Sequence, residues 1–201
     1  MRLHVLINSF FSFKNTIIKN ILLTKSGHIK MVDFGFAKFL HSNRRTSTFC
    51  GTPSYMAPEI VSRQSYNKSV DIWSLGCIIH EMVHGKTPFS AKTSIDTYQN
   101  ILISPYIPPV YISKSLTHLL QLMLSKKPED RPNAFEITEF KWFESIEWNK
   151  VDKGELNPPK HLCLNGKRKW KPKEGEIEDV FSCHPTIGNS ATDDTTDYPD
   201  F

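Results

Sequence analysis

Residues 67–85 read NKSVDIWSLGCIIHEMVHG, and this stretch decides the fold class. Apolar residues occur on nearly every side of a helix drawn through it, at Val70, Ile72, Trp73, Leu75, Ile78, Ile79, Met82 and Val83. A helix that is hydrophobic all round is a buried one. Gly85 is the residue type that commonly ends such a helix. The stretch therefore predicts a central helix against which the rest of the chain packs.

Further elements are predicted on both sides of this helix. SLTHLLQLML (115–124) repeats apolar residues at 116, 119, 120, 123 and 124, which predicts an amphipathic helix facing the same core. NAFEITEFKWF (133–143) follows Pro132 and predicts another helix. Upstream, NILL (20–23) and HIKMV (28–32) flank the turn TKSG and predict two short strands, with Gly27 in the turn. Residues 34–55 show no sustained period and predict a long loop, after which the domain is helical.

The composition is that of an ordinary globular protein with one core. The chain has 201 residues, of which 39% are hydrophobic and 23% are charged. A formal net charge of +4 is mild, so we expect neither a nucleic-acid nor a membrane partner, and no apolar run approaches the roughly 20 residues of a membrane span. The four cysteines form no CxxC pair, which favours a reducing compartment: the cytoplasm, with the nucleus as the alternative.

Beyond about residue 157 the chain is polar and Pro-rich, which predicts an extended tail. GKRKWKPK (166–173) is open to two functional interpretations, a nuclear signal or a contact with an acidic surface. We favour a solvated tail instead, because acidic residues follow at once. The eight histidines show no metal-ligand spacing, and His80 and His84 share a helix face that we expect at the edge of the helix bundle.

Two short motifs indicate phosphate chemistry. DFG (33–35) follows an apolar strand, and an aspartate at a strand end can present both oxygens to a magnesium ion held between nucleotide phosphates. Taken alone, the tripeptide is better explained as a strand-end turn with a solvated aspartate. APE (57–59) lies downstream at a spacing typical of an activation segment. Between them stands TSTFCGTPSYMAPE (46–59), and YNKSVDIWSLG (66–76) follows.

Together these motifs resemble a eukaryotic protein kinase. FCGTP, YNKSVDIWSLG and the later KWFESIEW…NPP are similar to the AGC group, and within it to the cyclic-nucleotide-dependent kinases. The resemblance runs from Asn20 to Pro159. It implies a predominantly helical α+β fold: the large C-terminal lobe with a short β-hairpin and an extended AGC-type tail, but no small lobe. The expected organisation is an unmatched segment 1–19, a partial kinase domain 20–145 and the tail 146–201.

The resemblance implies a serine/threonine protein kinase, a transferase that moves the γ-phosphate of ATP to protein hydroxyls with Mg²⁺. Asn20 and Asp33 match the two magnesium-binding residues, and Tyr198 aligns with a tail contact near the nucleotide. Thr48 matches the phosphorylated activation-loop threonine, with Lys38 as a basic neighbour of that phosphate. The implied partners are protein substrates and a regulatory subunit or an upstream activating kinase.

The same resemblance implies a substrate surface. Phe49, Pro53 and Met56 would line an apolar pocket for the residue after the phosphoacceptor. Thr52 matches the threonine that hydrogen-bonds the catalytic base. Glu81 matches a carboxylate that recognises a substrate arginine, although a solvated glutamate at a helix end is the alternative.

Three further positions imply structural roles. Glu59 and Arg131 match a buried ion pair that ties the activation segment to the later helices. Asp71 matches an aspartate that anchors the backbone of the catalytic loop from the start of the central helix.

The chain departs from the family pattern before Asn20. Asn15 and Ile17 stand where the family has its catalytic base and a lysine, so no catalytic residue is intact. An amide is not basic near neutral pH, and an isoleucine cannot stabilise the transferring phosphoryl group; such losses cost several powers of ten in rate. No Gly-rich loop, strand lysine or partner glutamate occurs before residue 20.

Two hypotheses follow. The first is that the chain is a truncated or alternatively started version of a kinase that is active when complete, with residues 1–19 unrelated to the parent enzyme. The second is a non-catalytic, pseudokinase-like binding module that docks substrates or regulatory subunits around the central helix and Glu81.

Overall fold

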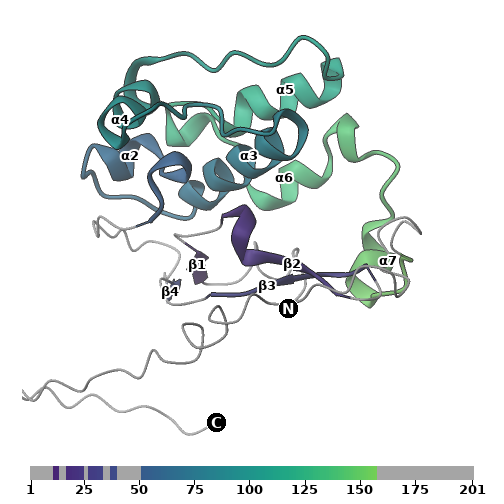
Figure 1. Ribbon diagram of the computed structural model, residues 1–201. Helices are drawn as coiled ribbons and strands as arrows, with labels where there is room; N and C mark the ends of the chain where they lie inside the picture. Colours follow the sequence, from purple (N-terminus) through teal and green to yellow (C-terminus); the bar gives the residue numbers. More distant parts are fainter. Residues whose placement is uncertain (1–10, 14–16, 25–26, 34–36, 40–50, 158–201) are drawn as a thin grey trace, which may run out of the picture. The chain divides into compact units, whose positions relative to one another are not determined.

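The computed structural model describes residues 11–13, 17–24, 27–33, 37–39 and 51–157. This part of the chain is mostly helical with short antiparallel strand pairs, as the predicted α+β class requires (Figure 1). Within these ranges no helix has the length and apolar composition that crossing a membrane requires.

The centre of the described chain is helix α3 (Ser69–His84). Val70, Trp73 and Ile78 are at most 1% exposed, which confirms the predicted buried helix. Gly85 ends it in the left-handed conformation, φ 81°, and donates its N–H to the carbonyl of Glu81 at 2.8 Å. The prediction was wrong for the last turn, because Met82 and Val83 are exposed and burial ends before the helix does.

Two hydrophobic clusters share α3. Helix α5 (Lys114–Met123) packs along α3, and all five apolar residues predicted for its buried face are at most 4% exposed (Figure 1). They are Leu116, Leu119, Leu120, Met123 and Leu124. The first hydrophobic cluster contains Trp73 of α3 together with Phe89 and Ile101. The second hydrophobic cluster contains Ile72 and Ile79 of α3 together with buried residues of α5.

The helix predicted over 133–143 is shorter than the pattern indicates. Helix α6 covers Ala134–Thr138, begins at a capping box of Asn133 and Glu136, and is followed by the 3₁₀ helix η4 (Lys141–Phe143). Phe140 between them is extended, with φ −65° and ψ 140°, and interrupts the helix. The 3₁₀ helix η3 (Pro128–Asp130) precedes this region, and α7 (Trp148–Lys153) follows it.

Three elements contribute with α3 to the first hydrophobic cluster. They are the 3₁₀ helix η2 (Pro53–Tyr55), α2 (Pro58–Val61) and α4 (Ser94–Ile103), and α4 packs against both of the others. Helix α4 was not predicted from the sequence. Its signal is an N-cap: the Thr93 hydroxyl accepts a hydrogen bond from the Asp96 N–H at 3.1 Å.

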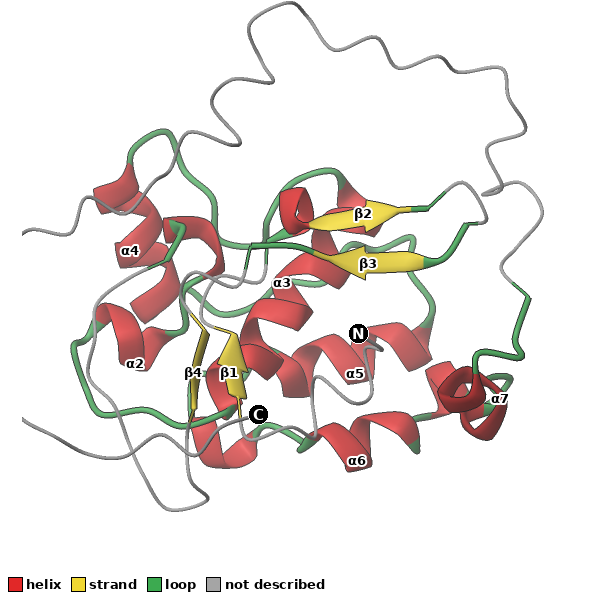
Figure 2. Cartoon of the chain, turned by 90° about the horizontal axis from the view of Figure 1, so that it is seen from below, coloured by secondary structure: helices red, strands yellow, loops and turns green. Residues whose placement is uncertain are grey.

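The strands form two separate pairs (Figure 2). The predicted hairpin is confirmed as β2 (Ile21–Leu23) antiparallel to β3 (Ile29–Met31), with Gly27 at φ 84° in the turn. The 3₁₀ helix η1 (Ile18–Asn20) leads into β2. The second pair joins β1 (Phe11–Phe13) to β4 (Ala37–Phe39), with Ser12 opposite Lys38. The loop predicted over 34–55 was therefore wrong at 37–39 and at 53–55, where β4 and η2 form. Elements of three residues are too short to show a period in the sequence, and β4 depends on a distant partner.

Candidate functional site

The hairpin brings Asn20 and Asp33 together. Asn20 stands directly before β2, and Asp33 stands two residues after β3. Antiparallel pairing puts both at the same end of the hairpin, where the Val32 N–H donates to the Asn20 carbonyl at 2.9 Å. The Asn20 side-chain amide, Nδ2, donates to Asp33 Oδ2 at 3.3 Å. The local fold of 14 residues therefore places the two predicted magnesium ligands within hydrogen-bond distance.

Asp33 has an unusual backbone. Its φ of 62° lies in the left-handed region, which costs most non-glycine residues roughly 1–2 kcal/mol and is best tolerated by Asn and Asp. Strained backbone of this kind is concentrated at functional sites. Asp33 is exposed, so its carboxylate is open to solvent. Asn20 is buried, so its side chain is held in place by the surrounding residues.

The donor chemistry of this pair suits Mg²⁺, which binds one or two carboxylate or amide oxygens together with phosphate oxygens. Among the residues that the structure describes, no group of three or more His, Cys, Asp or Glu side chains could hold a metal ion. A cation at Asn20 and Asp33 would therefore depend on oxygens from a bound nucleotide and water.

Ile17 occupies the position matched to the family's lysine. It is the N-cap of η1, it is half-buried, and it packs against the first hydrophobic cluster. Its carbonyl accepts a hydrogen bond from the Asn20 N–H at 3.0 Å. Ile17 therefore serves as an apolar anchor for the turn that positions Asn20. Asn15 lies outside the described residues.

The segment that holds Thr52, Pro53 and Met56 passes close to α3. Met56 is only 4% exposed and belongs to the first hydrophobic cluster, whereas Thr52 and Pro53 are half-buried. Ser74 of α3 donates its hydroxyl to the Tyr55 carbonyl at 3.1 Å. This hydrogen bond fixes the backbone of the segment to the central helix.

Glu81 has a partner in the same segment. The Tyr55 hydroxyl donates a hydrogen bond to Glu81 Oε2. Burial and, after it, this hydrogen bond raise the pKa of Tyr55 above its usual value, so the phenol stays protonated and keeps donating. Glu81 is thus held against the predicted substrate segment, while one of its oxygens is not engaged by Tyr55. Tyr55 was not predicted as a site residue, and its only signal in the sequence is its place between two predicted substrate residues.

Glu59 and Arg131 form a bidentate ion pair. Arg131 Nη1 and Nη2 lie 2.7 and 2.8 Å from Glu59 Oε1 and Oε2, and both residues are buried. The guanidinium also donates to the carbonyls of Ser69, Ser125 and Lys126. This is the link from α2 to the later helices that the resemblance implies.

The other site predictions have less structural detail. Asp71 lies in the first turn of α3. Lys38 lies in β4, of which only the backbone is described. Thr48, Phe49 and Tyr198 lie outside the described residues.

Two histidine–tyrosine contacts on α3 escaped the sequence analysis. His80 Nδ1 lies 3.0 Å from the Tyr106 hydroxyl, and His84 Nδ1 lies 2.6 Å from the Tyr111 hydroxyl. His84 is exposed, but His80 is only 4% exposed and does not lie at an edge. Burial and the neighbouring His84 lower the pKa of His80 to about 4, so this imidazole is neutral near pH 7.

Comparison with known proteins agrees with these motifs. Residues 14–143 match the protein kinase domain family. The chain is 34% identical over 187 residues to the ribosomal protein S6 kinase alpha-3 of Homo sapiens, covering 90% of this chain and 24% of that protein. It is 37% identical over 166 residues to the serine/threonine-protein kinase Sgk1 of Gallus gallus, covering 80% and 38%. It is 36% identical over 182 residues to a protein kinase C of Drosophila melanogaster, covering 88% and 25%.

The extent of these matches has two features. The chain spans about a quarter to two fifths of the length of these relatives. The family match begins at residue 14, so it includes residues 14–19, which the sequence analysis assigns to the unmatched segment.

Proposed function

This chain belongs to the protein kinase family, with AGC-group serine/threonine kinases among its relatives, and from that premise we propose two binding functions. Asn20 and Asp33 bind a magnesium–nucleotide complex, and residues 52–56 with Glu81 bind a serine- or threonine-containing protein segment. The observation that carries the proposal is the Asn20–Asp33 hydrogen bond of 3.3 Å, because it joins two oxygen-bearing side chains at a hairpin end where the Asp33 carboxylate is exposed.

Each of these residues has a separate role in binding. The Asp33 carboxylate and the Asn20 amide oxygen supply the protein ligands, and η1 holds Asn20 in place through the Ile17 carbonyl. Bound magnesium would neutralise the charge of the nucleotide phosphates. Glu81 offers a carboxylate to a basic substrate side chain, and Tyr55 orients that carboxylate.

We further propose that phosphate transfer by this chain alone is slow. Asn15 replaces the base, and a general base contributes about 10²–10⁴-fold to such reactions. Ile17 packs against the core and carries no charge to place beside the phosphoryl group. Neither side chain supplies a ligand to the magnesium ion, so nucleotide affinity and transfer rate should separate.

Nucleotide binding is tested first, by titration calorimetry with ATP in the presence and absence of Mg²⁺. Asp33→Asn should weaken Mg²⁺-dependent binding by about tenfold or more, since each 1.4 kcal/mol of lost metal contact is tenfold. Asparagine tolerates the left-handed backbone of Asp33, so this variant should fold. Asp96→Asn, at an exposed aspartate on α4, is the matched control and should bind as the native chain does. Absence of Mg²⁺-dependent binding by the native chain would overturn the proposal.

Transfer is tested by restoring the two missing groups. The double variant Asn15→Asp with Ile17→Lys should raise radiolabelled phosphate transfer to an arginine-containing serine peptide by about 100-fold or more. Adding Asp33→Asn should abolish the gain. The control pairs Asn15→Asp with Ile17→Gln, which adds polarity at position 17 without charge. If nucleotide binding is intact and the restored variant transfers no faster, residues 15 and 17 do not occupy the catalytic positions.

A second function, that of a non-catalytic binding module, is favoured by one observation. The Tyr55–Glu81 contact forms between η2 and α3, with neither partner in the region before Asn20. Fluorescence anisotropy with an arginine-containing peptide should then show binding without nucleotide. Glu81→Gln should weaken that binding, and equal affinity of the variant and the native chain would contradict this function.

A further inference from the structure

Lys126 ties the end of α4 to the loop after α5. Its Nζ donates to the carbonyl of Ile101 at 2.5 Å and to that of Asn100 at 3.4 Å. Both carbonyls belong to the last turn of α4, where the helix dipole places partial negative charge, and the Asn100 carbonyl also accepts a hydrogen bond from the Ser104 N–H at 3.0 Å. A lysine that comes from outside the helix therefore satisfies and neutralises its C-terminus.

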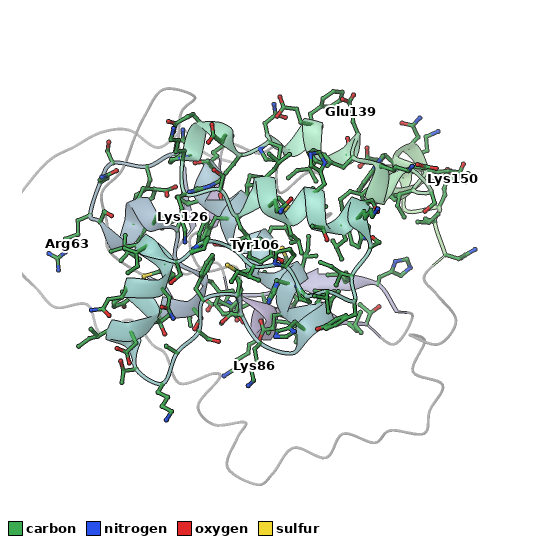
Figure 3. All side chains as sticks on the ribbon, turned by 90° about the horizontal axis from the view of Figure 1, so that it is seen from above. Arg63, Lys86, Tyr106, Lys126, Glu139 and Lys150 are labelled. Atoms are coloured by element: carbon green, nitrogen blue, oxygen red, sulfur yellow. The ribbon has the colours of Figure 1, made fainter. Side chains whose placement is uncertain are left out.

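The same ammonium group lies over two aromatic rings. Lys126 Nζ is 3.8 Å from the centroid of Phe89 and 5.2 Å from that of Trp73. These two rings are stacked, with centroids 5.3 Å apart and planes at 10°. Cation–π contacts strengthen as water is excluded, and both rings are buried. Figure 3 shows Lys126 among the helices, as it does Tyr106, whereas Arg63 and Lys150 lie at the periphery of the view.

The backbone of Lys126 is held by the Glu59–Arg131 ion pair. Arg131 donates from Nε to the Ser125 carbonyl at 2.9 Å and from Nη2 to the Lys126 carbonyl at 3.4 Å. The guanidinium carbon lies 5.1 Å from the Trp73 ring. Lys126 is thus fixed at its main chain by Arg131 and reaches α4 with its side chain.

α4 in turn packs against η2, the middle of the substrate segment 52–56, and against α2, which carries Glu59. From these contacts we infer that Lys126 is a positioning residue: it holds α4 against η2 and so raises the affinity of residues 52–56 for a protein substrate that it does not touch. This inference rests on the proposed substrate-binding function.

The positive charge of Lys126 should contribute to holding α4 against η2. The ionisable groups that face it are Cys77 of α3, whose pKa burial raises so that it stays a neutral thiol, and Arg131, which is cationic. Burial, with a smaller contribution from Arg131, lowers the pKa of Lys126 to about 8. The cation–π and helix-end interactions of the ammonium group should therefore weaken as the pH rises from 7 to 9.

The experiment compares three variants of the full chain. Lys126→Met keeps the apolar stem without the charge, Lys126→Arg keeps the charge, and Lys127→Met is the control at the neighbouring exposed lysine. Peptide affinity is measured by fluorescence anisotropy, and Mg²⁺–ATP affinity by calorimetry. Lys126→Met should weaken peptide binding about tenfold, equal to about 1.4 kcal/mol of coupling, and leave nucleotide binding unchanged. Lys126→Arg should restore peptide binding, and Lys127→Met should have no effect.

The outcomes separate positioning from general stability. Equal loss of peptide and nucleotide binding in Lys126→Met, or no loss of either, would overturn the inference. If that variant does not fold, the pH profile decides: peptide affinity of the native chain should fall between pH 7 and 9, and that of Lys126→Arg should not. A flat native profile would overturn the inference.

If the native chain binds no peptide, the substrate-binding proposal fails, and amide hydrogen exchange then tests Lys126 independently. Faster exchange at the Tyr55 and Met56 amides in Lys126→Met supports the link from α4 to η2, and unchanged exchange overturns it.

Discussion

Replacing Glu59 by glutamine should strongly destabilise the fold, because it leaves the buried Arg131 guanidinium without its counter-ion. The five N–H groups of Arg131 meet five acceptors: the two Glu59 oxygens and the carbonyls of Ser69, Ser125 and Lys126. Glutamine has the same shape but no charge, and its NH₂ group would face a guanidinium donor. A fully satisfied buried network would therefore become an unpaired buried charge.

The magnitude follows from burial. Glu59 and Arg131 are 4% and 7% exposed, so solvent cannot replace the lost partner. Removing one member of such a pair costs about 3–5 kcal/mol, which for a domain of this size lowers the melting temperature by roughly 6–20 °C. The surface pair of Glu147 and Lys150, at 2.8 Å, provides a matched control: Glu147→Gln should change stability by about 0.5 kcal/mol or less.

Urea unfolding followed by tryptophan fluorescence measures both changes, and Trp73 reports from beside the guanidinium. Combining Glu59→Gln with Arg131→Met removes both charges, so the double variant should be less destabilised than the sum of the single variants. The reasoning is refuted if Glu59→Gln costs less than about 1 kcal/mol, or if it resembles the Glu147→Gln control.

Three further predictions concern the core and one helix start. Gly76→Ala should lower the free energy of unfolding, measured by thermal unfolding, by about 1–3 kcal/mol, because a Cβ there would lie 3.1 Å from side-chain atoms of Met123 and Leu124. An unchanged free energy of unfolding would show that α3 and α5 can move apart to admit the methyl group. The pKa of His80 is lowered to about 4 in the folded chain, so the unfolded chain takes up a proton first as the pH falls from about 6.5 to 4, and the free energy of unfolding should decrease over that range. His80→Gln should flatten the dependence of the urea midpoint on pH in this range. An unaltered dependence would contradict the lowered pKa of His80. Asn133→Ala removes the capping box of α6 and should cost about 0.5–2 kcal/mol by urea unfolding, and an unchanged midpoint would mean that α6 does not depend on its cap.

The local patterns of the sequence predicted the main elements well. The buried stretch 70–79 and the amphipathic stretch 116–124 appear as α3 and α5, because a helix shows its buried face at a fixed spacing along the chain. The hairpin around Gly27 was also predictable, since a tight turn needs specific residues. The helix over 133–143 was predicted too long, because the extended backbone at Phe140 leaves no trace in the apolar spacing.

Motif order predicted the candidate site residues, and the structure shows which of the described ones are in contact. Asn20 and Asp33 lie near each other in the chain, so a hairpin suffices to join them. Tyr55 and Glu81 are 26 residues apart and belong to different elements, and neither sequence period nor motif spacing indicates that contact.

By itself, the sequence determined which segments are helical, where the hairpin turns, and which motifs of the kinase family the chain carries, because each of these is encoded within a few neighbouring residues. Only the tertiary structure decided that β1 pairs with β4, that Ile17 packs into the core, and that Lys126 reaches the end of α4. These contacts join residues about 25 positions apart, and their free energy depends on burial and on partners that chain-local patterns do not encode.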